Sequence, residues 1–221
     1  MLTFIGNQTE RQFNKINITG GTYAAIGDSI TSGVGVTSTQ TYHYLLGQDR
    51  SVSVTNLGES GQTLTTNAFR SGLKSKLNSS YGKDLITVFA GTNDWSFNIP
   101  LGSELEIGDY AIRPCMNYFI QQIKLNSPSS VLIFILPTYR ERTSDGTENV
   151  FDPVNDIGLR ISDYVNAEKQ MCIKNGVRYS NAYDYDGLKI SNIDSWTTDD
   201  LHLNASGHAS IESLLFNTHI E

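Results

Sequence analysis

The feature that most constrains the fold of this 221-residue chain is a nearly unbroken apolar run at residues 84–90, Asp-Leu-Ile-Thr-Val-Phe-Ala. A strand with one face in solvent alternates apolar and polar residues, whereas a strand covered on both faces is apolar along its length. Strands of the second kind belong to parallel sheets that carry helices on both sides. The run therefore predicts a central strand of such a sheet.

Four further segments have the composition of strands, and helical periodicity separates them. The predicted strands cover residues 22–27, 51–57, 84–90, 131–136 and 177–182. The predicted helices cover residues 41–47, 64–77, 114–127, 155–175 and 205–216. Strands that alternate with helices predict one α/β domain with a five-stranded parallel sheet. We assign this domain to residues 21–221 and interpret residues 1–20 as an N-terminal arm.

The composition excludes several classes of protein. Hydrophobic residues make up 38% of the chain and charged residues 18%, which is typical of a globular domain. The formal net charge of −7 argues against nucleic-acid binding, which needs clustered Lys and Arg. Cys115 and Cys172 have neither a disulfide framework nor metal-ligand spacing, so we predict two buried thiols and no metal site.

The sequence leaves the compartment and the oligomeric state open. Its first residues lack the basic start and long apolar core of a signal peptide. No apolar run approaches the roughly 20 residues needed to span a bilayer. The protein either stays in the cytoplasm, leaves by another route, or has lost a leader.

Gly27-Asp28-Ser29 follows the first predicted strand directly. Ligands of α/β proteins bind at the carboxyl ends of the strands, so a serine there suits a nucleophile. An ordinary turn is the alternative, because Asp and Ser often bond their own backbone in turns. The nucleophile hypothesis therefore depends on finding a base and oxyanion donors elsewhere in the chain.

Two later turns and one C-terminal loop supply these partners. The parallel order brings Ser29, Gly61 and Asn93 to one edge of the sheet, where two backbone N–H groups and an amide form a predicted oxyanion hole. His202 is the predicted base, and Asp199, three residues earlier, is predicted to orient its ring. Asp200 is the alternative acid, although its spacing to His202 is one residue shorter.

We predict structural roles for the other polar residues close in sequence to Ser29, Asn93 and His202. We expect Asp28 to bond the local backbone and Asp94 to support the turn at Asn93. His43 is predicted to be a surface or packing residue, since it has no acidic partner at useful spacing. His208 is predicted to pack within its helix.

The order of four blocks resembles the SGNH hydrolases, also called the GDSL esterase/lipase family. The blocks are Gly27-Asp28-Ser29-Ile30, Ser60-Gly61-Gln62-Thr63, Gly91-Thr92-Asn93-Asp94 and Asp199-Asp200-Leu201-His202. The resemblance implies a flavodoxin-like α/β/α sandwich, a triad of Ser29, His202 and Asp199, and no cofactor. Ile30 replaces the usual Leu of the first block, a change at a packing position.

The expected reaction is hydrolysis of a carboxylic ester, and we favour removal of acetyl groups from a small or polymeric carbohydrate. The polar, Tyr-rich composition motivates this choice. Trp95, Tyr139 and Arg140, in the loops after the third and fourth strands, are the predicted substrate contacts. A solvated loop face is the alternative for Arg140, and aromatic side chains that only pin the loops are the alternative for the other two. Other activities left open are a lysophospholipase or thioesterase, a sugar O-acyltransferase and an inactive binding module.

Overall fold

A five-stranded parallel sheet forms the centre of the computed structural model, which describes residues 13–140 and 152–221. The strand order is β2-β1-β3-β4-β5, and each neighbouring pair is parallel. The strands are β1 (Thr22–Gly27), β2 (Ser53–Gly58), β3 (Leu85–Phe89), β4 (Val131–Ile135) and β5 (Arg178–Ser180). This is the flavodoxin-like order, so the predicted fold class is confirmed.

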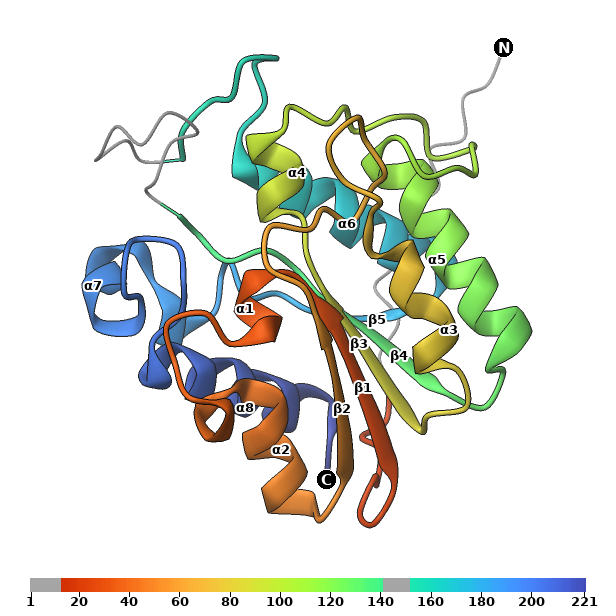
Figure 1. Ribbon diagram of the computed structural model, residues 1–221, viewed down its shortest axis with the longest axis vertical. Coiled ribbons are helices and arrows are strands. Elements are labelled where there is room, and N and C mark those ends of the chain that lie inside the picture. The colour runs from red at the N-terminus through yellow and green to blue at the C-terminus, as the bar shows by residue number, and fades with distance from the viewer. Residues whose placement is uncertain (1–12, 141–151) are drawn as a thin grey trace.

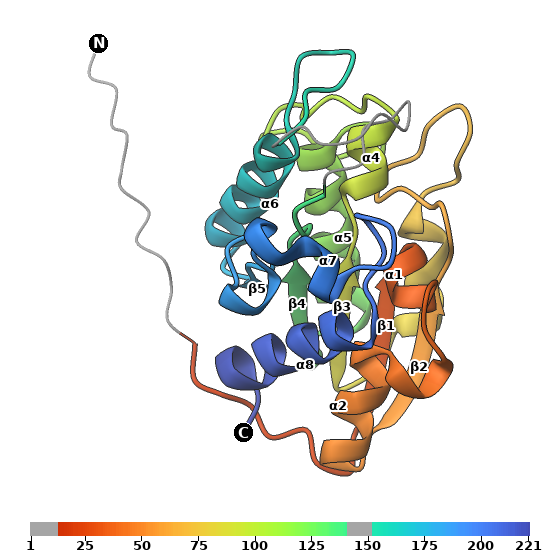
Figure 2. The same ribbon diagram turned by 90° about the vertical axis from the view of Figure 1, so that its left-hand side faces the viewer.

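Helices cover both faces of the sheet and complete the three layers (Figures 1 and 2). One face carries α2 (Tyr42–Arg50) and α8 (Ala205–His219), and the other carries α3 (Leu77–Ser80), α5 (Ile112–Asn126) and α6 (Ile161–Asn175). Short helices and single turns follow several strands. They are α1 (Ser29–Ser32), α4 (Thr92–Ser96), α7 (Ile193–Trp196), η1 (Ser38–Gln40), η2 (Leu73–Lys76), η3 (Asp186–Leu188) and η4 (Ile190–Asn192).

The side chains of β3 show why its sequence is apolar throughout. Ile86 and Val88 belong to the apolar cluster under α5 and α6, whereas Leu85 and Phe89 belong to the cluster under α2 and α8. Successive side chains of a strand point to opposite faces, so two covered faces require apolar residues at every position. Thr87 is the polar exception, and its hydroxyl lies 2.8 Å from the Tyr23 hydroxyl.

Two glycines at strand ends allow α1 to approach the sheet closely. A Cβ on Gly58 would lie 2.2 Å from the backbone nitrogen of Ser32. A Cβ on Gly27 would lie 2.7 Å from the Thr31 Cβ in α1 and 2.6 Å from the Phe89 carbonyl oxygen of β3. Side-chain atoms do not fit at these distances, so both positions require glycine if the turn at Ser29 is to sit against the strands.

Two predicted helices are wrong in extent. Residues 64–72 form a loop rather than the first half of a helix, and only η2 and α3 are helical in the predicted span. Gly72 ends this loop at a φ of 73°, in the left-handed region. The helix predicted from residue 155 begins at Ile161 instead, since Gly158 has a φ of 82° and Asn155 bonds the backbone of Leu159. Tertiary and side-chain contacts override helix periodicity in both segments.

The described part of the predicted arm packs against the end of the chain. Ile16 forms a parallel bridge with Ile220, and Ile18 is buried. Residues 1–12 lie outside the described residues.

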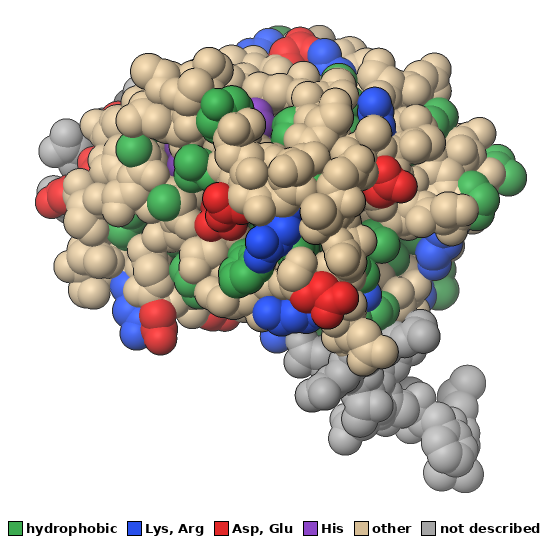
Figure 3. All heavy atoms as spheres, turned by 90° about the horizontal axis from the view of Figure 1, so that it is seen from below, with side chains coloured by type: hydrophobic (Ala, Val, Ile, Leu, Met, Phe, Trp, Pro, Cys, Tyr) green, Lys and Arg blue, Asp and Glu red, His purple; other side chains and the backbone are tan. Residues whose placement is uncertain are grey.

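Both cysteines are free and buried. No helix within residues 13–140 and 152–221 is long and apolar enough to cross a membrane. Basic and acidic side chains are interspersed on the face in Figure 3, which is seen from below.

Candidate active site

Ser29 is the first residue of α1, directly after β1, and is 5% exposed. Asp28 caps this short helix, because its carboxylate accepts a hydrogen bond from the Ile30 backbone N–H at 3.0 Å. The predicted local role of Asp28 is therefore confirmed. Burial raises the pKa of Asp28 to about 7. The turn thus directs the Ser29 hydroxyl to the carboxyl edge of the sheet, where Figure 1 shows α1 above β1.

The imidazole of His202 lies between Ser29 and Asp199. Its Nε2 is 3.0 Å from the Ser29 Oγ, and its Nδ1 is 2.9 Å from an Asp199 carboxylate oxygen. When Nδ1 carries the ring proton, it donates to Asp199 and leaves Nε2 free to accept the serine proton. Chemically, this arrangement can supply a nucleophile, a base and an orienting acid.

The loop that carries His202 is short and holds itself in shape. The backbone N–H of His202 donates to Asp199 at 2.8 Å, so the same carboxylate fixes both the backbone and the ring. Asp200 has a φ of 61°, in the left-handed region, which turns the chain between these two residues. Asn204 then caps α8 through bonds from Ser206 and Gly207. Asp199, three residues before the histidine, is the acid that bonds the ring.

Gly61 and Asn93 come from the turns that follow β2 and β3. Gly61 has a φ of 75°, which favours glycine, and the Asn93 side-chain amide donates to the Gln62 carbonyl at 2.9 Å. That contact brings the two blocks together at the edge where β1, between β2 and β3, ends two residues before Ser29. An amide nitrogen has two N–H groups, so the bond to Gln62 leaves one for another acceptor.

Asp94 has a role that differs from the predicted one. Its fully buried carboxylate accepts bonds from the backbone N–H of Leu64 at 2.8 Å and of Thr65 at 3.1 Å. The Thr65 hydroxyl adds a third bond at 2.8 Å. Burial raises the pKa of Asp94 above its ordinary value. Asp94 therefore braces residues 64–72 from across the sheet edge, rather than only its own turn. These residues form the loop after Ser60-Gly61-Gln62-Thr63, which we call the glycine block.

The three predicted substrate contacts are buried. Trp95 is 0% exposed, Tyr139 2% and Arg140 3%, so none presents a free face to solvent. The guanidinium of Arg140 lies 4.8 Å from the Trp95 ring centroid and donates to the Thr92 and Ser96 hydroxyls. The Trp95 indole donates to the Leu159 carbonyl at 3.0 Å. Arg140 therefore holds α4 from inside through Thr92 and Ser96. Direct contact of these three residues with a substrate stays a prediction.

An exposed aromatic lies elsewhere, in the loop after the glycine block. Phe69 is 73% exposed, and its ring stacks on Phe97 at a centroid distance of 6.1 Å. Sequence reasoning missed Phe69 because residues 64–77 were predicted to be helical, whereas Phe97 was expected in the loop that walls the site. Residues 141–151, in the loop after β4, lie outside the described residues.

Both remaining histidines near the site are packing residues, as predicted. His43 is 4% exposed and bonds the Thr31 carbonyl through Nε2 at 3.0 Å. His208 accepts a bond from the Tyr42 backbone and stacks on the Tyr42 ring. Burial lowers the pKa of His208 to about 4. Neither histidine contacts Ser29.

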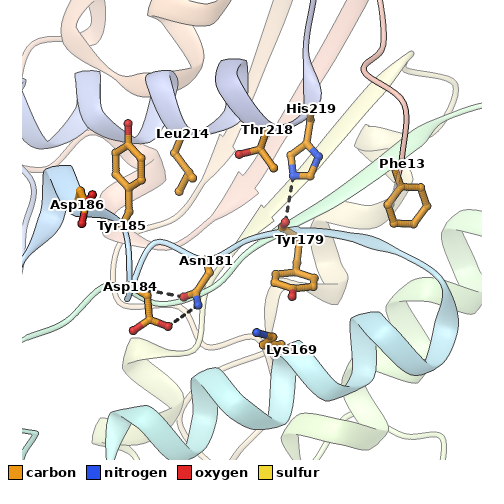
Figure 4. A pocket seen from close by; sticks show the side chains of 10 residues that line it. All are labelled: Phe13, Lys169, Tyr179, Asn181, Asp184, Tyr185, Asp186, Leu214, Thr218 and His219. Carbon is orange, nitrogen blue, oxygen red and sulfur yellow. Dashed lines mark hydrogen bonds between the residues drawn. The ribbon is translucent and has the colours of Figure 1, made fainter. Parts of the chain in front are cut away.

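A cavity of about 730 Å³ lies between β5, α6 and α8 (Figure 4). Its polar groups bond one another: the His219 ring bonds the Tyr179 carbonyl, and the Asn181 amide donates to Asp184. Neither Ser29 nor His202 lines it. Within residues 13–140 and 152–221, no three His, Cys, Asp or Glu side chains are grouped to hold a metal ion.

At the carboxyl edge of the parallel sheet, Ser29 contacts a histidine whose other ring nitrogen contacts an aspartate, within a three-layer α/β fold. The chain belongs to the GDSL-like lipase/acylhydrolase family, whose model matches residues 25–210. Membership supports ester hydrolysis as the general activity. No curated protein matches the chain.

Solved structures share the fold over most of the chain. A Lactobacillus plantarum protein is 25% identical with a TM-score of 0.78, over 93% of this chain and all of the other. A possible lipase from Chitinophaga pinensis is 21% identical with a TM-score of 0.72, over 89% of this chain and 96% of the other. A lipase/acylhydrolase from Enterococcus faecalis is 18% identical with a TM-score of 0.64, over 89% and 94%.

Proposed function

We propose that the protein hydrolyses carboxylic esters through an acyl-enzyme on Ser29, with His202 as general base and Asp199 as its orienting acid. The observation that carries the proposal is the continuous contact from Asp199 through His202 to Ser29, at 2.9 and 3.0 Å. These three groups supply a nucleophile, a proton acceptor and a tautomer-fixing partner, so the proposed reaction needs no cofactor.

In the first half-reaction, Ser29 Oγ attacks the ester carbonyl carbon while His202 Nε2 takes the hydroxyl proton. Asp199 stabilises the imidazolium that forms. The tetrahedral intermediate collapses when His202 returns the proton to the leaving alcohol, which departs and leaves the acyl group on Ser29. In the second half-reaction, water repeats these steps, with His202 as its base, and releases the carboxylic acid.

The proposed oxyanion donors are the backbone N–H groups of Ser29 and Gly61 and the side-chain amide of Asn93. The bond from Asn93 to the Gln62 carbonyl fixes that amide before substrate binds. Preorganised donors stabilise the charge on the former carbonyl oxygen without reorganising during the reaction, and each contributes about 3 kcal/mol.

We propose an acetylated carbohydrate as the substrate. The exposed Phe69 ring, stacked on Phe97, supports this choice, because an aromatic face next to polar groups suits a sugar ring. It replaces the buried Trp95 as the candidate platform.

Two measurements test the proposal. The p-nitrophenyl esters, graded by acyl length, should be cleaved fastest at acetyl, and incubation with a slowly deacylating ester should add one acyl mass to Ser29. Ser29→Ala is the control and should take up no acyl group. A kcat/KM that climbs steadily from acetyl to decanoyl would favour a lysophospholipase or thioesterase instead. Acetyl transfer to an added sugar in preference to water would identify an O-acyltransferase.

A further inference from the structure

The loop after the glycine block has a tightly braced tip beside α4 (Figures 1 and 2). The backbone groups of Asn67 and Arg70 bond each other, and the Asn67 side chain accepts from the Phe69 N–H at 2.8 Å. The Thr66 hydroxyl donates to the Ser71 carbonyl at 3.0 Å, across the base of the tip. These bonds hold the side chains of the tip in place before any ligand arrives.

Arg70 connects the two blocks that supply the proposed oxyanion donors. Its Nε donates to the Gly61 carbonyl at 2.8 Å, and its guanidinium carbon lies 5.2 Å from the Phe97 ring centroid. Phe97 follows Asn93 by one helical turn, and its N–H donates to the Asn93 carbonyl at 2.9 Å. The guanidinium therefore spans from the Gly61 turn to the end of α4.

The guanidinium retains hydrogen-bonding capacity that the protein does not use. A guanidinium has five N–H groups. One donates to Gly61, and one on Nη1 donates to the Phe69 carbonyl at 3.0 Å. Within residues 13–140 and 152–221, Nη2 makes no hydrogen bond, and a Cβ on Gly61 would lie 3.5 Å from it. These unused donors lie against the residue whose N–H is the proposed oxyanion donor.

The basic residues that follow Arg70 in sequence form ion pairs, whereas Arg70 acts on a carboxylate only at longer range. The hydrogen bond from Lys76 is the main cause that lowers the pKa of Glu59, and the charge of Arg70 adds a small part. Lys74 pairs with Asp109, and Lys76 lies 2.6 Å from Glu59. Glu59 also accepts from Gln62 at 3.0 Å, so its carboxylate is already engaged. In the described part of the chain, Arg70 forms no ion pair with a carboxylate. In a protein with a net charge of −7, this leaves a fixed positive charge at the rim of the site.

We propose that Arg70 selects, among the esters cleaved at Ser29, those that carry a carboxylate or phosphate close to the scissile bond. This inference rests on the proposed function and narrows its substrate to an anionic carbohydrate ester or a similar anionic ester. A planar guanidinium binds both anions through paired N–H groups, and such charge-assisted bonds are about twice as strong as neutral ones. The bonds to the Gly61 and Phe69 carbonyls hold the guanidinium beside Phe97, so little side-chain freedom is lost on binding.

A purely structural role for Arg70 makes the opposite prediction. If the bond to the Gly61 carbonyl only positioned that turn, loss of Arg70 would slow neutral and anionic esters equally. The test therefore compares matched pairs of esters. On the alcohol side these are para-acetoxybenzoate and para-acetoxyphenyl phosphate against neutral para-acetoxybenzamide. On the acyl side they are p-nitrophenyl hydrogen adipate against p-nitrophenyl hexanoate.

Arg70→Gln should lower the anionic-to-neutral ratio of kcat/KM by about tenfold on at least one side, and Arg70→Lys should retain part of it. Arg113→Gln removes the same charge from α5, away from the site, and should leave both ratios unchanged. Comparison of kcat/KM for the carboxylate ester and the phosphate ester then shows which anion the site prefers. Equal losses for every ester, or no change in any ratio, would overturn the inference.

A binding measurement separates this inference from the proposed function. Calorimetric titration with para-hydroxybenzoate and para-hydroxybenzamide should show a preference for the anion that Arg70→Gln loses. Equal affinity of wild type and Arg70→Gln for both compounds, together with flat kinetic ratios, contradicts the role of Arg70. Failure of the wild type to cleave any ester contradicts the proposed function instead.

Discussion

The Asn93 side and the His202 side of the candidate site each depend on an aspartate, but the two carboxylates work in different surroundings. Asp94, beside Asn93, is 0% exposed and bonds two residues about 30 positions away in sequence. The Asp199 side chain is 39% exposed and bonds His202, three residues away. One carboxylate braces the fold across elements, and the other orients a ring within its own loop.

The difference separates what stabilises the protein from what serves the proposed reaction. A buried carboxylate must be compensated by its hydrogen bonds, so its loss leaves buried N–H groups without partners. An exposed carboxylate can be replaced by water at little cost in folding free energy. Substitutions on the two sides should therefore affect different measurements.

The largest expected effect is on turnover, at the nucleophile. Ser29→Ala should fold normally and lose about 10⁴-fold or more in kcat, because the acyl-enzyme cannot form. His202→Ala should lose a comparable amount, and the double variant little more, since the two residues act as a unit. Rates of p-nitrophenyl acetate hydrolysis measure this, and substantial turnover by folded Ser29→Ala would contradict the assignment.

The next effect falls on the Asn93 side. Asn93→Ala should lower the acylation rate about 10²–10³-fold while Ser29 stays partly reactive towards organophosphates, because only an oxyanion donor is lost. Stopped-flow acylation measures the rate. A loss below about threefold would make Asn93 a turn residue only.

A pair of substitutions tests the comparison directly. Asp94→Ala should lower the free energy of unfolding by about 3 kcal/mol, because three hydrogen bonds to a buried carboxylate are lost. Asp199→Ala should change it by less than about 0.5 kcal/mol yet strongly reduce kcat. Urea denaturation and steady-state rates provide the two measurements. Similar losses of stability in both variants would remove the distinction between a brace and an orienting acid.

A pH dependence of stability is expected at Asp28. Burial raises its folded pKa to about 7, so between pH of about 4 and 7 the unfolded chain ionises this group while the folded chain holds the proton. Its contribution to stability is therefore full below the unfolded pKa and is lost as pH rises to about 7. Asp28→Asn keeps the helix-capping oxygen and removes this titration. The stability of the variant relative to wild type should rise by about 1 kcal/mol per pH unit in that window and level off outside it.

Asp84→Asn is the matched control for that measurement. Hydrogen bonds from Thr22 lower the pKa of Asp84, so its contribution to stability is present at higher pH and is lost as pH falls. The two variants should therefore depend on pH with opposite signs. The same sign in both would show that Asp28 is ionised in the folded protein.

Local patterns predicted the parallel sheet and the pairing of Asp199 with His202. A strand that is buried on both faces is apolar at nearly every position, as β3 is. An acid three residues before a histidine can contact it within one loop, as Asp199 contacts His202. The position of Ser29 after β1 was visible for the same reason, because one short turn determines it.

Contacts between distant segments were not predictable in this way. The partners of Asp94 lie in a loop whose apolar spacing resembled a helix, and the burial of Trp95 depends on Arg140 and Leu159 from later parts of the chain. The position of Arg70 depends on the same loop. A single sequence identifies the residues that form these contacts, but it does not show which distant segments lie next to each other in the fold.

The glycines that end β1 and β2 have a consequence for mutational scanning. Gly27 and Gly58 leave room for backbone and side-chain atoms that any Cβ would displace, so their substitution should lower the amount of folded protein in the cell. In a screen that scores only total activity, they would look as intolerant as Ser29. Measuring abundance beside turnover would separate them, because a Ser29 variant should accumulate normally and remain inactive, whereas a Gly58 variant should be degraded.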